Sequence, residues 1–425
     1  QANAQPDIYE LGFEEFWEQE GRERVTWFEP FTELYEWSPP YARWYLGGKL
    51  NICFNCVDRH VEAGQGEKVA YHWEGEPEDE RRTITFADLQ REVVRLANAL
   101  RSAGLAKGDR VAALLFNSPA MLEAHFGVPA AGGILVAVNN RLSGPEIGYI
   151  LQHSGAKYLL LDTGLEAVAE ASGLAGVTVI RCDDTGVPGD PYEEFLAGAS
   201  PARPASWLEH EEETISINYT SGTTGRPKGV QYTYRGAYLN ALSEVIVAGM
   251  GTDSAYLWTL PMFHCNGWCF PWAVTAVAAR HVTMRAVDPG LIWELIDGEG
   301  VTHYNGAPTV QLMVVNHPRA HRLERPVTAM VAAAPPSPTL LARMSELNFR
   351  VVHVYGLTET YGPITVCPEQ EAWRELPVDQ RARYLARQGQ AYPSSDLVRV
   401  VDEQMTDVPQ NGQVMGEVIM RGNNV

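Results

Sequence analysis

From residue 85 onward, the pattern of apolar and polar positions predicts helices that alternate with short strands. Thr85 and Asp88 are spaced as a helix-capping pair. Five apolar residues then recur every three or four positions before Gly104, namely Phe86, Leu89, Val93, Leu96 and Leu100. This spacing places one apolar stripe along a helix. Short apolar runs predict strands at 111–116, 134–138, 158–161, 177–180 and 215–219.

The alternation continues through the second half of the chain. Strands are predicted at 256–260, 282–284, 302–304, 328–332 and 351–354, and helices at 292–297 and 339–347. Strands that alternate with helices form mostly parallel sheets covered by helices, so we predict an α/β fold. After residue 395, the runs at 397–401 and 414–420 predict a small β-rich part.

Composition narrows the class of protein. The chain has 425 residues, of which 45% are hydrophobic, so it can bury a large core with more than one lobe. Lys and Arg number 33 against 53 Asp and Glu, a formal net charge of −20. Such a surface repels nucleic acid and anionic lipid on average, so an anionic ligand needs a local cluster of positive groups.

The cysteine content and the hydropathy of the chain indicate where in the cell the protein is expected. Six cysteines in a chain of this length predict reduced thiols. Cys53 and Cys56 have metal-ligand spacing, but no second pair follows, so buried structural thiols are the favoured interpretation. No run of eighteen apolar residues and no signal-peptide pattern occurs. We therefore expect a cytoplasmic protein without integral membrane association.

The segment 219–230, Tyr-Thr-Ser-Gly-Thr-Thr-Gly-Arg-Pro-Lys-Gly-Val, predicts a phosphate-binding loop. Glycines allow backbone N–H groups to converge on anionic oxygens, hydroxyls add donors, and Lys228 adds a positive charge. A strand is predicted just before it at 214–219 and a helix after it at 234–247, the layout of many phosphate sites. A flexible surface loop is the weaker alternative. Neither G-x-x-x-x-G-K-[ST] nor G-x-G-x-x-G occurs.

Three motifs resemble those of the adenylate-forming enzymes. Residues 219–230 are similar to the signature of that superfamily, and 355–360, Tyr-Gly-Leu-Thr-Glu-Thr, is similar to its Y-G-x-T-E motif. Residues 261–268, Pro-Met-Phe-His-Cys-Asn-Gly-Trp, resemble the P-x-F-H segment of the acyl-CoA synthetase branch. The resemblance implies the amino-terminal domain of an acyl-CoA synthetase: two stacked, mostly parallel sheet lobes with covering helices, plus a small β-rich lobe. Its boundaries are expected at 1–80 for an amino-terminal wrap, 81–395 for the α/β core and 396–425 for the start of the β-rich lobe.

The resemblance implies ATP, Mg²⁺ and CoA as cofactors and a small carboxylic acid as substrate. Lys228, His264, Thr358 and Glu359 match catalytic positions of the family, with Glu359 as the Mg²⁺ ligand. The positions implied to contact ATP are Thr220, Ser221, Gly222, Thr223, Thr224, Gly225, Lys228, Ala333, Ala334, Pro335, Tyr355, Gly356 and Thr358. Those implied to line the acyl pocket are His264, Trp268, Gly306, Ala307 and Pro308.

Each assignment has a structural alternative. Thr358 and Glu359 also fit a helix N-cap followed by a first-turn acid. Tyr355 and Trp268 fit core positions, and Trp268, Phe270, Trp272 and Val274 together predict one helix. Ala333 and Ala334 stand where the family often has glycines. His264 is expected to orient the substrate rather than to move a proton, because a carboxylic acid is already ionised at pH 7.

The acid itself is predicted from two conflicting resemblances. Residues 44–51 and 55–60 resemble the opening of acetyl- and propionyl-CoA synthetases, whereas residues from about 110 onward resemble ligases of medium-chain, long-chain or aryl acids. The pocket residues belong to the second part, so we expect an acid larger than acetate.

Other functions stay open at this point. The acyl acceptor could be an amine or a carrier protein, the chain could be a non-catalytic adenylate-binding domain, or it could be an unrelated ATP hydrolase. The later aspartate, hinge and lid lysine of the family have no match in the sequence. We therefore expect weak ATP binding and little complete turnover from these 425 residues. The oligomeric state stays open, a homodimer included.

Overall fold

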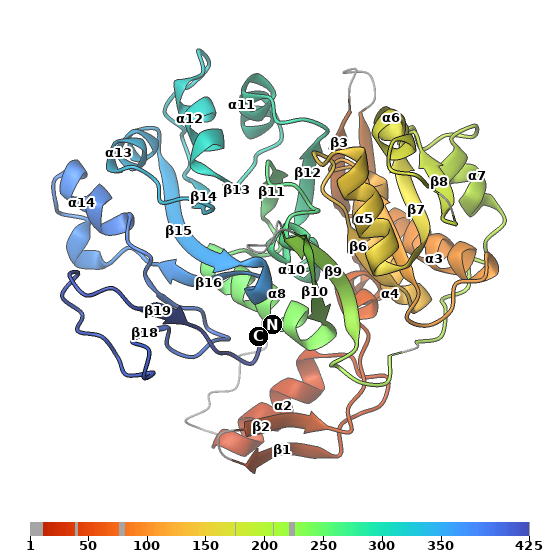
Figure 1. The fold of residues 1–425 in the computed structure, drawn as a ribbon, viewed down its shortest axis with the longest axis horizontal. Helices are drawn as coiled ribbons and strands as arrows, with labels where there is room; N and C mark the ends of the chain where they lie inside the picture. Colours follow the sequence, from red (N-terminus) through yellow and green to blue (C-terminus); the bar gives the residue numbers. More distant parts are fainter. Residues whose placement is uncertain are drawn as a thin grey trace.

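The computed structural model describes residues 12–38, 41–75, 81–174, 176–206, 208–220 and 226–424 (Figure 1). An amino-terminal part lies apart from the two large sheets and consists of α2 (Phe13–Arg24), β1 (Glu33–Ser38) and β2 (Tyr41–Leu46). β1 and β2 pair antiparallel, and the rings of Tyr35 and Trp44 stack across the pair at 5.0 Å. Two wide helical turns, η1 (Phe54–Asp58) and η2 (Val61–Gln65), then lead to the core.

A six-stranded sheet forms one half of the core, in the order β10-β9-β6-β5-β7-β8. Its strands are β5 (Arg110–Leu114), β6 (Ile134–Ala137), β7 (Ala156–Asp162), β8 (Thr178–Cys182), β9 (Thr214–Thr220) and β10 (Lys228–Thr233). Every pair is parallel except β9 with β10. Its helical segments are α3 (Phe86–Ser102), α4 (Pro119–Ala131), α5 (Gly144–Ser154), η3 (Thr163–Leu165), α6 (Glu166–Glu170) and α7 (Pro191–Ala197).

The two faces of this sheet are both apolar, as a parallel sheet between helices requires. Val111 and Ala113 of β5 pack with α3 and α4, whereas Ala112 and Leu114 pack with α5 on the other face. The predicted capping pair of α3 is confirmed. The Asp88 amide donates to the Thr85 hydroxyl at 3.1 Å, and the Asp88 carboxylate accepts from the Thr85 amide at 3.0 Å.

A nine-stranded sheet forms the other half, in the order β17-β16-β15-β14-β13-β11-β12-β3-β4. Its strands are β3 (Val69–Glu74), β4 (Arg82–Thr85), β11 (Ala255–Trp258), β12 (Arg280–Met284), β13 (His303–Gly306), β14 (Val327–Val331), β15 (Phe349–Leu357), β16 (Gly362–Cys367) and β17 (Gln390–Ala391). The strands from β3 to β15 in this order are parallel, and β4, β16 and β17 are antiparallel. The α/β fold with two mostly parallel sheets is thus confirmed.

Helices cover both faces of the second sheet. α11 (Pro289–Gly298), α12 (Pro308–Asn316) and α13 (Pro338–Glu346) pack on one face, and α8 (Tyr234–Ala248) and α10 (Phe270–Ala276) lie on the other. Beyond β15 come η4 (Thr358–Thr360), η5 (Glu371–Trp373) and α14 (Val378–Leu385). The two strands predicted after residue 395 are confirmed in shorter form as the antiparallel pair β18 (Arg399–Val401) and β19 (Glu417–Ile419).

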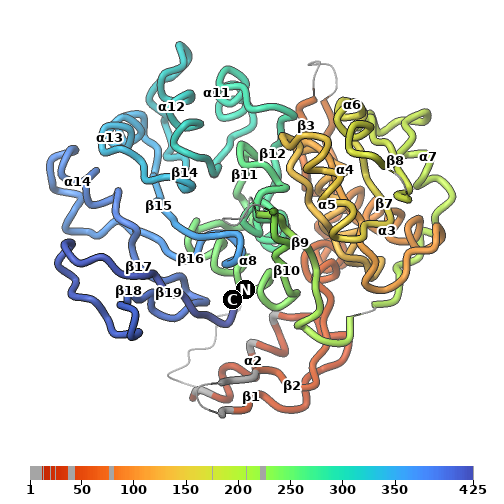
Figure 2. Tube along the Cα trace, in the orientation of Figure 1, coloured from red at the N-terminus to blue at the C-terminus, as the bar shows by residue number. Residues whose placement is uncertain are grey.

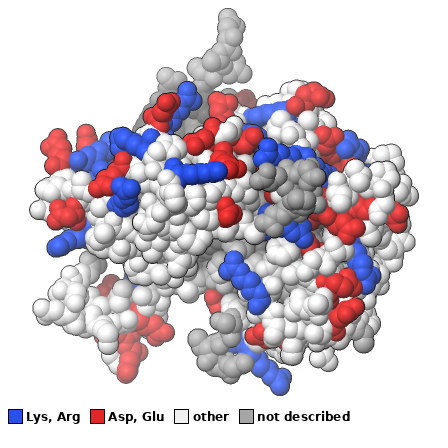
Figure 3. All heavy atoms as spheres, turned by 90° about the horizontal axis from the view of Figure 1, so that it is seen from above, with Lys and Arg blue, Asp and Glu red and all other residues white. Residues whose placement is uncertain are grey.

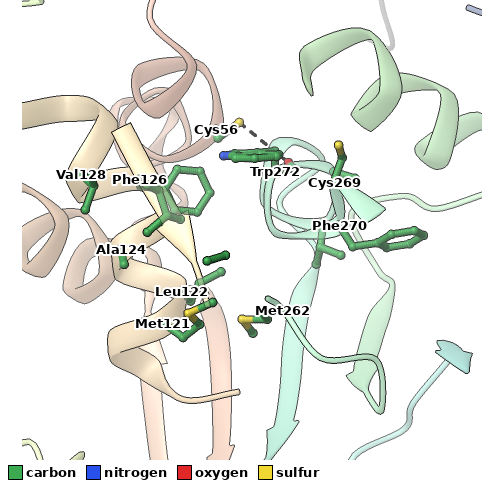
Figure 4. Packing of buried hydrophobic residues seen from close by; sticks show 14 of the residues in the cluster. Cys56, Met121, Leu122, Ala124, Phe126, Val128, Met262, Cys269, Phe270 and Trp272 are labelled. Carbon is green, nitrogen blue, oxygen red and sulfur yellow. Dashed lines mark hydrogen bonds between the residues drawn. The ribbon is translucent and has the colours of Figure 1, made fainter. Parts of the chain in front are cut away.

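The largest apolar cluster lies between the two sheets, where α4 of the first sheet faces α10 of the second (Figure 4). Phe126 and Met121 of α4 lie opposite Trp272 and Met262, and all four side chains are buried. The Cys56 thiol approaches the Trp272 carbonyl at 3.8 Å. This shared core ties the two sheets together, since its burial contributes roughly 25 cal/mol for each Å² of apolar surface.

The six cysteines are unpaired and buried, which confirms the interpretation as structural thiols. The Cys53 thiol donates to the carbonyl of Phe126 at 2.9 Å. No group of His, Cys, Asp or Glu side chains suited to a metal ion occurs among the residues that the structure describes. None of the helices described is long and apolar enough to cross a bilayer.

The surface carries both signs of charge despite the net charge of −20. On the face seen in Figure 3, Lys and Arg side chains are interspersed with Asp and Glu. One carboxylate is instead deep in the core. Glu123 of α4 is 3% exposed and accepts a hydrogen bond from the Tyr192 hydroxyl at 2.7 Å. Burial, assisted by the negative charge of Glu92, raises the pKa of Glu123 to about 8.

Glu123 should therefore make the fold less stable as the pH rises. Its pKa rises from an ordinary 4.5 to about 8 on folding, so the folded chain keeps a proton that the unfolded chain loses between these values. Stability falls wherever the folded state binds more protons than the unfolded state. The urea concentration at the midpoint of unfolding should fall between pH 5 and pH 8, and it should fall less in Glu123→Gln than in wild type. The exposed control Glu375→Gln should leave that loss unchanged. An equal pH dependence in wild type and Glu123→Gln would contradict this role.

Candidate functional site

Four neighbouring strands of the nine-stranded sheet end at one edge, and the residues that follow them gather there. β11, β13, β14 and β15 are parallel, so their carboxyl ends lie side by side. β11 is followed by the segment that ends at His264, and β13 ends at Gly306, directly before Ala307 and Pro308. Ala333, Ala334 and Pro335 follow β14, and Thr358 and Glu359 follow β15. The carboxyl edge of a parallel sheet is where α/β proteins bind ligands.

Tyr355 lies beside the segment that follows β14. Val331, the last residue of β14, pairs with His353, so Tyr355 extends two residues past the end of that strand. Its ring is half-buried, whereas Ala333, Ala334 and Pro335 are exposed. Ala333 has a φ of 74°, a left-handed conformation that favours glycine. The two predicted walls of an adenine site therefore stand on adjacent strands.

Glycine is required at position 356 for a structural reason that the sequence did not reveal. β15 contains a bulge between Tyr355 and Gly356, and Gly356 pairs with Pro363 of β16. A Cβ atom at Gly356 would overlap the backbone carbonyl of Gly362. The glycine is thus required by the close approach of two strands, which in turn sets the position of the Tyr355 ring.

The six-stranded sheet contributes the β9–β10 hairpin to the same region, between the two sheets (Figure 2). Thr220, the last residue of β9, pairs with Lys228, the first residue of β10. Lys228 is exposed and Thr220 is half-buried. Of the predicted phosphate loop, Ser221, Gly222, Thr223, Thr224 and Gly225 lie outside the described residues. The loop's exit is anchored on α5, because the Tyr149 hydroxyl donates to the carbonyl of Pro227 at 3.2 Å.

The predicted passage from strand through loop directly to helix is wrong. β10 intervenes between the loop and α8 and folds back antiparallel on β9. Its sequence, Lys-Gly-Val-Gln-Tyr-Thr, carries the signal that was missed, since Val, Tyr and Thr favour strands and Val230 and Tyr232 point to one face. The site is therefore a hairpin rather than a loop at the amino end of a helix.

Tyr232 and Thr233 of β10 join the hairpin to the residues after β15. The Tyr232 hydroxyl donates to the carbonyl of Thr358 at 2.7 Å. The ring of Tyr232 stacks on Tyr361 with centroids 4.1 Å apart, and the Thr233 amide donates to the Tyr361 hydroxyl at 2.9 Å. These contacts bring the predicted phosphate hairpin and the predicted Thr358 and Glu359 to one place.

Thr358 and Glu359 form a single helical turn, η4, with Thr360. The predicted N-cap role of Thr358 is wrong, because Thr358 is already inside the turn and it is the Thr360 hydroxyl that accepts from the Leu357 amide, at 2.9 Å. The Thr358 hydroxyl instead lies 3.4 Å from the Cys265 thiol. Glu359 is exposed, so a hydrated cation can reach its carboxylate.

His264 lies at the start of an unusual turn. The five residues from Cys265 to Cys269 all have φ between 41° and 64°. The single helix predicted through Trp268, Phe270, Trp272 and Val274 is therefore wrong at its first member. α9 (Cys265–Trp268) is a left-handed turn, and only the other three belong to the right-handed helix α10.

The imidazole of His264 is neutral near pH 7. The residue is partly exposed, yet partial loss of hydration and the charge of Arg141 lower the pKa of its imidazole. A neutral imidazole can donate to or accept from a carboxylic substrate without adding a full charge. Trp268 is 4% exposed and packs against Gly362, where a Cβ atom would meet the Trp268 side chain at 3.2 Å. Burial also raises the pKa of Cys265 to about 11, so this thiol is neutral.

Two known protein families match the chain. The family described as "AMP-binding enzyme" matches residues 57–425, and "Acetyl-coenzyme A synthetase N-terminus" matches residues 12–56. The second match confirms the predicted likeness of the opening to acetyl-type enzymes.

Curated relatives include an acetate/butyrate–CoA ligase from Arabidopsis thaliana, 39% identical over 356 residues, which cover 78% of this chain and 63% of the relative. A 4-hydroxybutyrate–CoA ligase from Metallosphaera sedula is also 39% identical, over 80% of this chain and 64% of its own length. The chain thus spans less than two thirds of these relatives.

Solved structures share the fold. The inhibitor-bound amino-terminal domain of FACL13 from Mycobacterium tuberculosis is 26% identical with a TM-score of 0.76, covering 89% of this chain and 90% of that one. ATP-bound MatB from Rhodopseudomonas palustris has a TM-score of 0.73 at 24% identity, covering 88% of this chain and 70% of that one.

Gly356 should tolerate no side chain. Gly356→Ala should lower the free energy of unfolding by at least about 2 kcal/mol, because the added methyl group forces β15 and β16 apart. The control is Gly298→Ala at the end of α11, where a Cβ atom meets nothing within 4 Å. This change should leave stability unchanged or raise it by up to about 1 kcal/mol. Equal stability of the two variants in urea unfolding would refute the strand contact as the reason for Gly356.

Proposed function

Because the chain belongs to the AMP-binding enzyme family, we propose that it carries the adenylation site of an AMP-forming acid–CoA ligase. In this reaction a carboxylate oxygen attacks the α-phosphorus of ATP, and pyrophosphate leaves with the electron pair of the broken P–O bond. The thiol of CoA then attacks the acyl carbon and AMP leaves. The observation that carries the proposal is the convergence of His264, Tyr355, Thr358 and Glu359 beside the hairpin that bears Lys228.

The nucleotide would lie along the edge of the nine-stranded sheet. Adenine would lie against the Tyr355 ring and the exposed backbone of Ala333, Ala334 and Pro335, since aromatic faces stack on bases. The hairpin loop with Thr220, Lys228 and the residues 221–225 would hold the β- and γ-phosphates. Thr358 would hydrogen-bond a phosphate oxygen. Glu359 would provide the protein ligand for Mg²⁺, which neutralises charge on the phosphates when bound.

The carboxylic acid would lie between His264 and Trp268. The neutral His264 imidazole would orient the carboxylate with a hydrogen bond, and no base is needed because the acid is ionised at pH 7. Trp268, with Gly306, Ala307 and Pro308 at the end of the neighbouring strand β13, would form the wall around the acyl group. The match of residues 12–56 to an acetyl-CoA synthetase amino terminus supports CoA, rather than an amine or a carrier protein, as acceptor.

We propose a short acid of two to about four carbons, because the buried Trp268 indole would fill space that a longer acyl chain needs. Names of the relatives support this range, since they include acetate, butyrate, 4-hydroxybutyrate and 2-methylpropanoate, although trans-cinnamate also occurs. The larger acid expected from the motif resemblance stays a prediction that the Trp268 experiment below also tests. A cytoplasmic location also stays a proposal, since the names of several relatives include "peroxisomal".

Lys228 should act on adenylate formation more than on acid binding. In a longer protein that includes this chain, Lys228→Ala should slow acid-dependent exchange of pyrophosphate into ATP by about 100-fold, since it removes a charge at the departing phosphates. The KM for the acid should change by less than about threefold. Lys157→Ala is the control, because Lys157 is a surface residue paired with Asp109 at 2.8 Å. Unchanged exchange in Lys228→Ala, or absence of AMP and pyrophosphate with every acid tried, would contradict the proposal.

Trp268 should set the length of the acid. Trp268→Gly removes the indole and also suits the φ of 56° at this position. The variant should gain affinity for octanoyl-sulfamoyl-adenosine relative to acetyl-sulfamoyl-adenosine by at least about tenfold, in keeping with the value of a few methylene groups in a pocket. Isothermal titration calorimetry on the 425-residue chain measures both. If wild type already prefers the octanoyl compound, the acid is large and the short-acid proposal is wrong.

A further inference from the structure

The left-handed turn Cys265–Cys269 is a bridge between the two sheets. Five consecutive residues with positive φ are costly, because only Gly and to a lesser extent Asn adopt this conformation readily. Gly267 is required, since a Cβ atom there would lie 2.7 Å from the Trp258 ring. Such strain persists only where surrounding contacts over-determine it. The contacts of the turn therefore indicate what it holds in place.

Asn266 makes most of these contacts from a fully buried position. Its Oδ1 accepts from the Ser216 hydroxyl at 2.7 Å and from the side-chain amide of Asn218. Its backbone amide donates to Asn218 Oδ1 at 3.0 Å, and its Nδ2 lies 3.0 Å from His125 Nε2. All of its side-chain hydrogen-bonding atoms thus have partners on β9 or α4, both of the six-stranded half.

The directions of these bonds are consistent with one another. Because Oδ1 of Asn266 accepts twice, its Nδ2 must be the donor to His125. Nδ1 of His125 then donates to the carbonyl of Met121 at 2.7 Å, as a neutral imidazole can. Burial lowers the pKa of His125 to about 4, which keeps the ring neutral at pH 7. Each polar side-chain atom of Asn266 and His125 thus has a partner, and buried polar networks of this kind specify one arrangement.

Two partners of Asn266, Ser216 and Asn218, lie on the face of β9 that leads to the phosphate hairpin. Side chains two residues apart in a strand share a face, so Ser216, Asn218 and Thr220 point the same way. Residues on either side of Asn266 reach the other sheet. Cys265 contacts the Thr358 hydroxyl at 3.4 Å, and the Cys269 thiol lies 3.7 Å from the carbonyl of Tyr361. The same turn begins next to His264 and contains Trp268.

We propose that Asn266 is a positioning residue that holds the acid side of the site, His264 and Trp268, in a fixed place relative to the phosphate side, Thr220 and Thr358. This inference rests on the proposed function, since it concerns the ligand formed there. A ligand that joins an acyl group to a nucleotide needs both halves in register, whereas AMP alone needs only the nucleotide half. Small displacements between two halves of a site weaken the joined ligand most.

The test compares two ligands on the 425-residue chain. Asn266→Gly keeps the left-handed backbone accessible and removes only the side-chain bonds. It should weaken binding of acetyl-sulfamoyl-adenosine by at least about tenfold while binding of AMP changes by less than about threefold. A role in folding alone would lower both affinities by the same factor. Equal losses for the two ligands, or no loss for either, would overturn the inference.

A pair of serine variants serves as a matched control and as a substitute if Asn266→Gly does not fold. Ser216→Ala removes one bond to Asn266, and Ser243→Ala removes a bond of a similarly buried serine, at 2.8 Å to the half-buried Ser394 outside the turn. Ser216→Ala should lower the affinity for acetyl-sulfamoyl-adenosine relative to that for AMP by at least about threefold, and Ser243→Ala should leave this ratio unchanged. The inference is wrong if the two serine variants behave alike.

The proposed function and the role of Asn266 can fail separately. If the wild-type chain binds neither ligand, the proposed function itself fails. If wild type binds both ligands and the variants leave the ratio of the two affinities unchanged, only the role of Asn266 is refuted.

Discussion

The contact between the β9–β10 hairpin and the segment that follows β15 is the constraint on which the rest of the structure depends. Each sheet has an apolar cluster of its own and both share the largest one, but non-directional packing of this kind is compatible with several relative positions of two sheets. The stacked rings of Tyr232 and Tyr361, with the hydrogen bond from Tyr232 to the Thr358 carbonyl, specify one of them. Directional bonds select an arrangement that non-directional burial alone leaves open.

The electrostatics of the site follow from the same arrangement. A chain with a net charge of −20 can accept a polyphosphate only where positive groups and donors are concentrated locally. Lys228 at the hairpin and the divalent cation that Glu359 could hold would supply this concentration. The groups on the acid side, His264 and Cys265, are both neutral near pH 7, because loss of hydration lowers the pKa of the imidazole and raises that of the thiol. An anionic acid would therefore meet a neutral imidazole and a neutral thiol there.

Most helices and strands could be predicted from the sequence, whereas the geometry of the site could be predicted only in part. The cap and apolar stripe of α3 are local patterns, so they could be predicted before any tertiary contact was known. Short apolar runs predicted β11 and β14 to within two residues, whereas β15 continues to Leu357, past its predicted end at residue 354. The turn Cys265–Cys269 could not be predicted, because its conformation is imposed by bonds from Asn266 to residues about 50 and 141 positions away. Periodicity alone made Trp268 look like the first turn of α10.

A crystal structure of this chain with acetyl-sulfamoyl-adenosine tests the central claim most directly. The account predicts the adenine ring against Tyr355 and residues 333–335, the sulfamoyl group beside Thr358, and the acetyl group between His264 and Trp268. Electron density for the ligand at any other place, with the edge formed by β11, β13, β14 and β15 vacant, would contradict it.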